Sequence, residues 1–252
     1  MTKPQAADIS GPASAKPNLD LWIARGITLG PVALAFPVAT WLVFGLGSDR
    51  KATADGLALI YSFGLFLGFT TSLWPLPSLR SWTGRERLQS LCLLFLIVSC
   101  ITHLSWELIW LVAHDAIAGS RDAAWAYPWW AYIDGGDMRY AEATPTLLMM
   151  EVLSVSNGAI CALGLALWYR SNGTDIRAVL LFMAMAVVHL YSTSLYYGGE
   201  IIAGLPNVDT SSVLDTWVKF GLANVSWLVF PPCVLAWGAG IILRRDGGPR
   251  GS

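Results

Sequence analysis

The sequence predicts an all-α protein, a polytopic integral membrane helical bundle of about six transmembrane helices. Of its 252 residues, 55% are hydrophobic and 13% are charged, whereas soluble domains carry about 25% charged residues. Six apolar segments reach the length of about 20 residues that a helix needs to cross the hydrocarbon layer. They lack barrel-like alternation, and only helices or closed barrels satisfy their backbone groups within lipid.

The six expected spans are joined by short connections, apart from one long loop after the third span. They cover residues 26–46, 57–77, 88–113, 145–169, 177–198 and 214–243. The third and sixth are long enough to tilt or to project from the bilayer. The expected organisation is a disordered polar tail (1–24), two N-terminal transmembrane helices (25–80), a four-helix region (81–243) and a cytoplasmic tail (244–252).

The distribution of basic residues supports an even number of spans. With six spans, 11 Lys and Arg residues lie on the side of the two termini and 4 lie on the opposite side, while Lys219 falls within the last span. Because basic residues concentrate in cytoplasmic loops, both termini are expected to be cytoplasmic.

Charge and cysteine content exclude several classes of partner and site. The net charge of −1 gives no indication of a nucleic-acid partner. The four cysteines lie singly inside apolar segments without a CxxC pair, which argues against a zinc site or a disulfide framework. The expected partners are the membrane and a lipid-like small molecule, with a homodimer left as an open alternative.

The loop at 114–144 is rich in aromatic residues and contains WAYPWWAYIDGGDMRY. Trp and Tyr favour the headgroup layer, so an interfacial aromatic belt is one interpretation. Long loops in compact domains are often functional, so a lid over the mouth of a cavity is the other. The two interpretations are compatible.

Ionisable side chains inside the spans mark a candidate site, because their burial in lipid is costly unless they face a cavity or a partner. His103 and Glu107 are four residues apart in the third span and therefore share one helix face. Glu151 lies near the start of the fourth span. The other candidate residues, expected to bind a substrate or a cation, are Trp106, Tyr191, Thr193, Tyr196, Asn224 and Trp227.

These polar residues share a depth in the membrane when each helix is counted at about 1.5 Å per residue. Glu107 and Glu151 then lie roughly 9 Å below the outer ends of their spans, and His103 and Asn224 lie about 15 Å below. Polar groups from four antiparallel helices therefore gather in one layer, in the outer half of the membrane. Unrelated polar residues would not be expected to share a depth, so the layer indicates a site.

Structural roles compete with functional ones at several positions. A single histidine in a membrane helix is often an interhelical hydrogen-bond donor, and His189 is assigned to that role. Glu200, at the edge of the fifth span, fits a solvated helix end as well as a site residue. The HLSWE segment lacks the second histidine of an HExxH motif, so no metal site is expected. His103 differs from His189 because Glu107, one turn away, can orient its ring.

The chemistry that such a site can perform follows from its components. Proton donors and carboxylates in a dry, aromatic-lined pocket can protonate an alkene and later remove a different proton. The intermediate is a carbocation, which Trp faces and carboxylates stabilise. The sequence shows no Gly-rich phosphate loop, haem or flavin signature, or Ser-His-Asp arrangement, so acid–base chemistry without a cofactor is expected.

From about Gly84 to Leu243 the sequence resembles the emopamil-binding protein family, the sterol Δ8–Δ7 isomerases of the EXPERA superfamily. The resemblance rests on the order and spacing of GRERLQSLC, HLSWE, GGDMRY, MMEVLS, LYSTSLYYGGE and NVSWLVFP. It implies that 81–243 is an EXPERA-like catalytic region. The family moves a double bond in the sterol B ring by protonation and deprotonation through a carbocation. Its members also bind cationic amphiphilic drugs that mimic this cation.

The resemblance also implies roles for individual residues. The positions that match the family's site residues are His103, Glu107, Glu151, Asn224 and Trp227. Asp137, Arg139 and Tyr140 match the family's loop motif, which implies that they help to close the site. For a eukaryotic host the family implies the endoplasmic reticulum, and a bacterial host would imply the inner membrane.

Three departures from the family pattern concern the pocket wall. The family is usually described with five spans, whereas here an additional one, 26–46 or 57–77, precedes the shared region. Thr193 stands where the family commonly has an acidic residue, and Asn157 stands where a bulky aromatic residue is expected. These changes keep the proton-handling residues, so they leave the reaction type better defined than the substrate.

Three functions are compatible with the sequence. The leading prediction is an intramembrane isomerase that shifts a carbon–carbon double bond in a sterol or polycyclic terpenoid. A membrane-bound terpenoid cyclase would use the same acid to open an epoxide or to protonate a prenyl chain. The third is a non-catalytic sterol- or lipid-binding protein. The presence of His103 beside two glutamates favours an enzyme over a binding protein.

Overall fold

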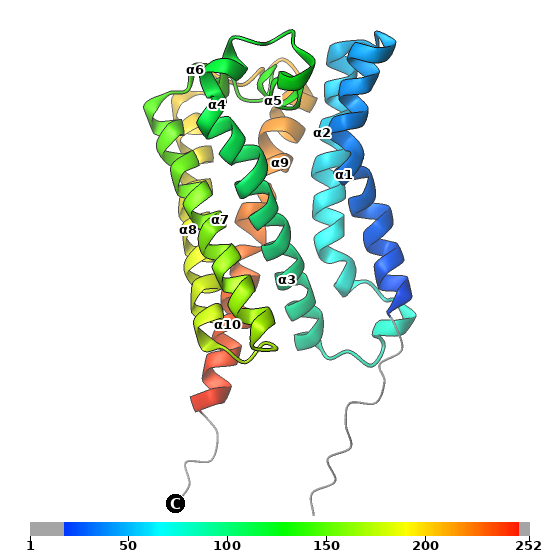
Figure 1. The fold of residues 1–252 in the computed structure, drawn as a ribbon, viewed down its shortest axis with the longest axis vertical. Coiled ribbons are helices and arrows are strands. Elements are labelled where there is room, and N and C mark those ends of the chain that lie inside the picture. Colours follow the sequence, from blue (N-terminus) through cyan, green and yellow to red (C-terminus); the bar gives the residue numbers. More distant parts are fainter. Residues whose placement is uncertain (1–17, 247–252) are drawn as a thin grey trace, which may run out of the picture.

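A computed structural model describes residues 18–246 of the chain. Within this range the secondary structure is helical, and six segments are long and apolar enough to cross a membrane. The all-α, multi-pass bundle that the sequence predicts is therefore confirmed (Figure 1). These six helices make the protein an integral membrane protein.

The spans run up and down the bundle in chain order (Figure 1). They are formed by α1 (Leu19–Leu46), α2 (Arg50–Thr70), α3, η3 and α4 (Gly84–Thr102, His103–Glu107, Leu108–Ala118), α7 (Pro145–Arg170), α8 (Ile176–Ala203), and η5, α9 and α10 (Leu214–Leu222, Ala223–Val229, Pro231–Asp246). The connections hold the short helices η1 (Thr71–Leu73), η2 (Pro77–Leu79), η4 (Ala124–Ala126), α5 (Tyr127–Ile133) and α6 (Arg139–Glu142).

The first span begins earlier than the sequence predicted. Helix α1 starts at Leu19, so the end of the predicted disordered tail (1–24) is helical, while residues 1–17 lie outside the described range. The Asp20 carboxylate accepts a hydrogen bond from the backbone N–H of Ser78 (2.9 Å). A carboxylate in the first turn favours a helix start, and its bond to Ser78 holds this turn against η2.

Two further boundaries differ from the predicted ones. Helix α2 starts at Arg50 because the Asp49 side chain accepts a hydrogen bond from a backbone N–H of the first turn (2.7 Å). A side-chain cap of this kind replaces a missing helical partner and extends the helix toward its N-terminus. Helix α10 continues to Asp246, into the predicted tail at 244–252, of which residues 247–252 lie outside the described range.

The two described ends of the chain lie at one end of the bundle, and α5 and α6 lie at the other, called here the loop end (Figure 1). This arrangement agrees with the even number of spans predicted from the basic residues. The assignment to the cytoplasm of the end that holds the two described ends of the chain stays a prediction.

Aromatic packing closes the bundle on both sides of its middle. Away from the loop end, the rings of Phe69, Phe95 and Phe230 pack with centroids 5.0 to 5.8 Å apart. Toward the loop end, Trp110 packs edge-on against Tyr140 with centroids 4.9 Å apart. Such pairs contribute about 0.5–1.5 kcal/mol beyond the area that they bury, so both ends of the interior are firmly filled.

The N-terminal hairpin of α1 and α2 packs closely because two glycines of α2 face α1. A Cβ atom on Gly64 would lie 2.4 Å from Val32 Cγ2, and one on Gly68 would lie 2.3 Å from Leu29 Cδ2. Small residues permit such close approach of membrane helices. The hairpin therefore forms a continuous wall beside the rest of the bundle (Figure 1).

Candidate functional site

A cavity of about 600 Å³ extends from the middle of the bundle toward the loop end, and all six spans contribute to its wall. Its volume lies within the range of about 300–1,000 Å³ that is usual for small-molecule sites. Ile101 and Ile109 line the cavity and are also 61% and 45% exposed on the outer surface. The cavity therefore reaches the lipid-facing side of the bundle at the third span.

A chain of three ionisable side chains lines one wall of this cavity. His103 Nδ1 contacts the Glu107 carboxylate, and His103 Nε2 lies 2.7 Å from His189 Nε2. Both histidines are 2% exposed. The predicted pairing of His103 with Glu107 is present, and His189, which the sequence assigned to an interhelical hydrogen bond, contacts His103 from α8 as the third member of the chain.

The hydrogen bonds of this chain fit two proton arrangements. When His103 carries its proton on Nδ1 and donates it to Glu107, its Nε2 accepts the N–H of His189. When His103 is also protonated on Nε2, it donates to His189 Nε2 instead, and the single ring proton of His189 then lies on Nδ1. His189 Nδ1 has no hydrogen-bond partner. Because imidazole can donate from either nitrogen, the chain can store a proton or release one.

Local backbone geometry places His103 in this chain. Residues His103–Glu107 form the π-helical turn η3 within an otherwise α-helical span, and single π-helical turns are frequent at functional sites. On the facing helix α7, a Cβ atom added to Gly158 would lie 2.7 Å from His103 Cβ. A glycine at this position therefore lets the histidine approach α7 closely.

A second acid–base group comes from α7 and the loop. Glu151 is 4% exposed, and its Oε1 accepts a hydrogen bond from the Tyr140 hydroxyl (2.5 Å), while its Oε2 has no partner. Burial raises the pKa of the Tyr140 phenol well above its usual value, and the Glu151 carboxylate raises it further. The phenol therefore stays protonated and acts as a donor to Glu151.

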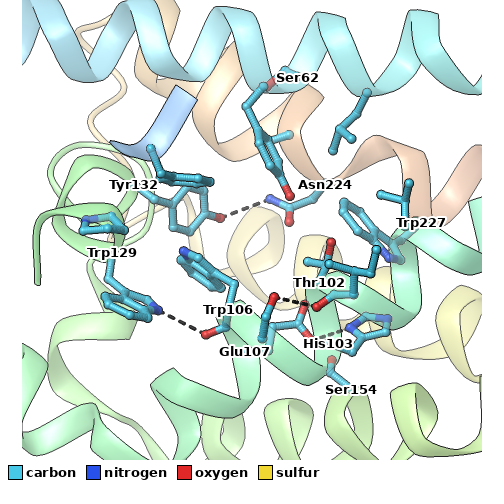
Figure 2. Close-up of a pocket in the computed structure, with 18 of the residues that line it drawn as sticks. Ser62, Thr102, His103, Trp106, Glu107, Trp129, Tyr132, Ser154, Asn224 and Trp227 are labelled. Carbon is cyan, nitrogen blue, oxygen red and sulfur yellow. Dashed lines mark hydrogen bonds and ion pairs between the residues drawn. The ribbon is translucent and has the colours of Figure 1, made fainter. Parts of the chain in front are cut away.

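A hydroxyl and amide network connects the loop to the fifth and sixth spans. The Tyr132 and Tyr196 hydroxyls lie 2.5 Å apart, and the Asn224 amide donates to the Tyr132 hydroxyl (3.1 Å; Figure 2). Burial raises the pKa of Tyr132 far above its usual value. Asn224 and Tyr196 were predicted to line the site, and both do.

Two tryptophans supply aromatic surface to the cavity. The Trp227 ring lies 6.3 Å from the His103 ring (Figure 2), and the Trp106 ring lies 5.6 Å from that of Tyr140. Both indole N–H groups lack a hydrogen-bond partner. Aromatic faces attract cations, so these positions suit the predicted role in stabilising positive charge.

Of the predicted residues in the fifth span, Thr193 and Tyr196 line the cavity and Tyr191 does not. Tyr191 is 63% exposed, so the structure does not bring it together with the other predicted residues. At about 100° per residue it lies about 200° around α8 from His189, on the lipid-facing side.

Asp137 and Arg139 fasten the loop and do not line the cavity. Arg139 Nη2 lies 2.7 Å from Asp137 Oδ2, and Arg139 Nε lies 3.6 Å from Glu200 Oε1. Glu200 is 2% exposed and accepts a hydrogen bond from the Asn207 amide (2.5 Å). The interpretation of Glu200 as a solvated helix end is therefore wrong, because the carboxylate anchors the loop motif.

The aromatic loop covers the cavity. Trp129 lines it and donates its indole N–H to the Trp106 carbonyl (3.1 Å), and the buried Trp130 donates to a carbonyl of α4 (2.7 Å). Trp125 is 51% exposed, as a residue of an interfacial belt would be. The loop thus has the position of a lid, and Trp125 also fits the belt interpretation.

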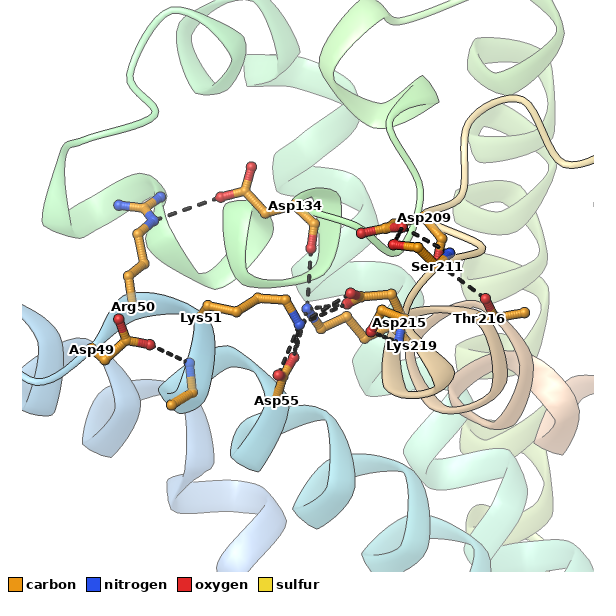
Figure 3. Close-up of polar contacts among 12 residues, drawn as sticks. Asp49, Arg50, Lys51, Asp55, Asp134, Asp209, Ser211, Asp215, Thr216 and Lys219 are labelled. Atoms are coloured by element: carbon orange, nitrogen blue, oxygen red, sulfur yellow. Dashed lines mark hydrogen bonds and ion pairs between the residues drawn. The ribbon is translucent and has the colours of Figure 1, made fainter.

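A cluster of charges around the buried Lys219 joins the N-terminal hairpin to the loop end of the last span (Figure 3). Lys219 Nζ lies 2.6 Å from Asp215 Oδ1 and 3.1 Å from Asp55 Oδ1, and it donates to the Asp134 carbonyl (3.1 Å). Lys51 also contacts Asp55 (2.6 Å) and Asp215 (3.0 Å). The cluster therefore ties α2, α5 and η5 together beside the cavity.

The two glycines of the GGDMRY motif allow the loop to pack on this cluster. A Cβ atom on Gly135, whose φ is +85°, would lie 2.6 Å from Asp215 Cγ. One on Gly136 would lie 2.4 Å from the Tyr132 carbonyl and 2.9 Å from Lys219 Cβ. The loop can therefore pack over the last span only because these two residues are glycines.

The sequence did not indicate that the N-terminal hairpin and part of the loop line the cavity. The lining residues not predicted include Leu29, Phe36, Tyr61, Ser62 and Tyr132. Most of them look like ordinary lipid-facing residues in the sequence, so only the packing of the hairpin against the bundle identifies them.

The chain matches no protein-family model. Among residues 18–246, no group of three or more His, Cys, Asp or Glu side chains is arranged to hold a metal ion. The fold and the cavity define an integral membrane protein with a largely apolar intramembrane cavity, whose wall carries two sets of proton donors and acceptors.

Proposed function

We propose that the protein is an intramembrane isomerase that shifts a carbon–carbon double bond in a sterol or polycyclic terpenoid. The observation that carries the proposal is the presence of two acid–base groups on one aromatic-lined, largely apolar cavity. These groups are the chain of Glu107, His103 and His189, and the pair of Tyr140 and Glu151. An isomerisation of this kind needs one group to add a proton and another to remove one.

The reaction balances without a cofactor. The acid donates a proton to one alkene carbon, and the π electrons form the new C–H bond, leaving a carbocation on the neighbouring carbon. A base then removes a proton from the other carbon that is bonded to the cationic carbon. The electrons of that C–H bond form the shifted double bond. The proton that is added equals the proton that is removed.

The cavity offers each component of this reaction. The Glu107 carboxylate contacts His103 Nδ1 and so orients the imidazole ring in the cavity. The Oε2 atom of Glu151 lacks a hydrogen-bond partner, so it is available to exchange a proton with a bound molecule. The faces of Trp106 and Trp227 can stabilise the carbocation through the ring quadrupole. Placement on helices and buried loops holds these groups in position before the substrate arrives.

The resemblance to the emopamil-binding protein family supports the same reaction. The residues that match the family's site positions all line the cavity: His103, Glu107, Glu151, Asn224 and Trp227. Because the cavity reaches the lipid-facing surface at Ile101 and Ile109, a substrate dissolved in the membrane fits it better than a water-soluble one. The expected membrane is the endoplasmic reticulum in a eukaryotic host and the inner membrane in a bacterial one.

Product analysis by mass spectrometry tests the proposal. Membranes that contain the protein are incubated with a Δ8-sterol and, separately, with a linear prenyl epoxide. An isomer of the sterol supports the proposal. A cyclised product from the epoxide with unchanged sterol would indicate a terpenoid cyclase, and saturable sterol binding without any product would indicate a binding protein. Either of these two results would overturn the proposed isomerase activity.

A further inference from the structure

Ser62 is a buried polar residue on the hairpin wall of the cavity that the proposed chemistry does not use. It lies on α2, is 1% exposed, and lines the cavity. Its hydroxyl has no hydrogen-bond partner. Leaving a buried hydroxyl unsatisfied costs about 1–3 kcal/mol, so a polar group of a bound molecule is an expected partner.

Several other hydroxyls in the spans donate to a carbonyl of their own helix. Thr28 and Thr40 each donate to the carbonyl four residues before them (2.9 Å in both cases), and Ser105 does so at 2.5 Å. Serine and threonine in helices commonly adopt this arrangement. Ser62 does not, so its hydroxyl has no partner on its own helix.

Ser62 lies across the cavity from the proton-handling residues. Figure 2 shows Ser62 on α2 at one side of the pocket, with His103 and Glu107 at the opposite side. On the same face of α2, its neighbours four residues before and three residues after are Ala58 and Leu65, which also line the cavity. The side chains above and below Ser62 on this face of α2 are therefore apolar.

We propose that Ser62 binds an oxygen-bearing group of the substrate, a hydroxyl or a carbonyl, and so holds the reacting double bond against the opposite wall. A neutral hydroxyl in apolar surroundings suits a neutral oxygen, because a charged group would be left without compensation. A serine hydroxyl can donate to a carbonyl, and it can donate to or accept from an alcohol. The inference rests on the proposed function, since it assigns an orientation to that substrate.

A binding comparison with three probes of one carbon skeleton tests this inference. The full-length protein is placed in lipid nanodiscs, and its affinity is measured for a Δ8-sterol, the corresponding 3-ketone and the 3-deoxy hydrocarbon. One neutral hydrogen bond should make the alcohol and the ketone bind about 3- to 10-fold more tightly than the hydrocarbon. The variant Ser62→Ala should bind all three probes equally.

Ser99→Ala is the matched control. Ser99 is also fully buried and its hydroxyl also lacks a partner, but it does not line the cavity. This variant should keep the wild-type preference for the oxygenated probes. A preference that survives in Ser62→Ala, or that is absent from the wild type, would overturn the inference, as would failure of all three probes to bind.

The two proposals fail in different ways. Loss of the oxygen preference in Ser62→Ala, together with no product from the wild type, would keep the binding role of Ser62 and overturn the isomerase. Product formation by the wild type with an unchanged preference in Ser62→Ala would keep the isomerase and overturn the role of Ser62.

Discussion

Replacing Lys219 by methionine would remove the central charge of the cluster that joins the hairpin, the loop and the last span. The Lys219 side chain is fully buried, and its ammonium group contacts Asp215, Asp55 and the Asp134 carbonyl. Methionine keeps much of the length of the side chain, so the main change is the loss of charge. The Asp215 carboxylate, which is also fully buried, would lose its nearest cation.

The magnitude follows from the contacts that remain. Removing one partner of a buried ion pair costs about 3–5 kcal/mol. Lys51 still contacts Asp215 at 3.0 Å and Asp55 at 2.6 Å, but it is 49% exposed and is therefore screened by water. We expect this compensation to reduce the loss to about 2–3 kcal/mol. At about 2–4 °C per kcal/mol for a chain of this size, Tm should fall by about 5–10 °C.

Thermal unfolding of the purified protein in detergent, followed by tryptophan fluorescence, measures this change. Lys51→Met should lower Tm by less than half as much, because its charge is half exposed. The double variant Lys219→Met/Asp215→Asn should recover much of the loss, because it removes the uncompensated carboxylate as well. A Lys219→Met variant as stable as the wild type would refute the reasoning, as would a Lys51→Met variant that loses more.

Three further outcomes are expected. Gly135→Ala should lower Tm, because its Cβ would lie 2.6 Å from Asp215 Cγ at a φ of +85°; an unchanged Tm would show that the loop does not pack tightly there. Glu151→Gln should abolish sterol isomerisation, measured by mass spectrometry, while Tm stays near that of the wild type; full activity would exclude Glu151 as an acid–base group. His189→Ala should lower kcat about 10- to 100-fold, because it removes a proton-handling partner of His103. His114→Ala, on α4 outside the cavity, should keep kcat unchanged, and an equal loss in both variants would contradict the assignment.

The class of fold was predictable because span length and hydropathy are local properties. Each span needs only a sufficient run of apolar residues, and all six were found. Their ends were less predictable, because Asp20 and Asp49 extend α1 and α2 through hydrogen bonds that composition does not reveal. The bond from Asp20 reaches Ser78, which no local pattern connects to it.

The candidate site was predictable where one helix contains both partners. His103 and Glu107 are four residues apart, so their contact follows from helix geometry. Contacts between side chains on different helices depend on how each helix is rotated about its axis. An estimate of depth in the membrane does not provide this rotation. His189 and Tyr191 show this limit, because the first faces His103 and the second faces lipid.

The sequence indicated only some of the contacts of the charge cluster. Lys219 stood out as a cation within an apolar span, and a buried cation requires a partner. One partner, Asp215, is one turn away, whereas Asp55 lies on the hairpin and is distant in the chain. Contacts between the hairpin and the last span depend on tertiary packing, and the same packing brings Ser62 to the cavity.

The position of solvent deuterium in the product tests the central claim most directly. The protein is incubated with a Δ8-sterol in deuterated water, and the product is examined by mass spectrometry and NMR. Protonation by one group and deprotonation by another predict a shifted double bond with deuterium on the carbon that becomes saturated. A shifted double bond without deuterium, or an unchanged sterol, would contradict the account.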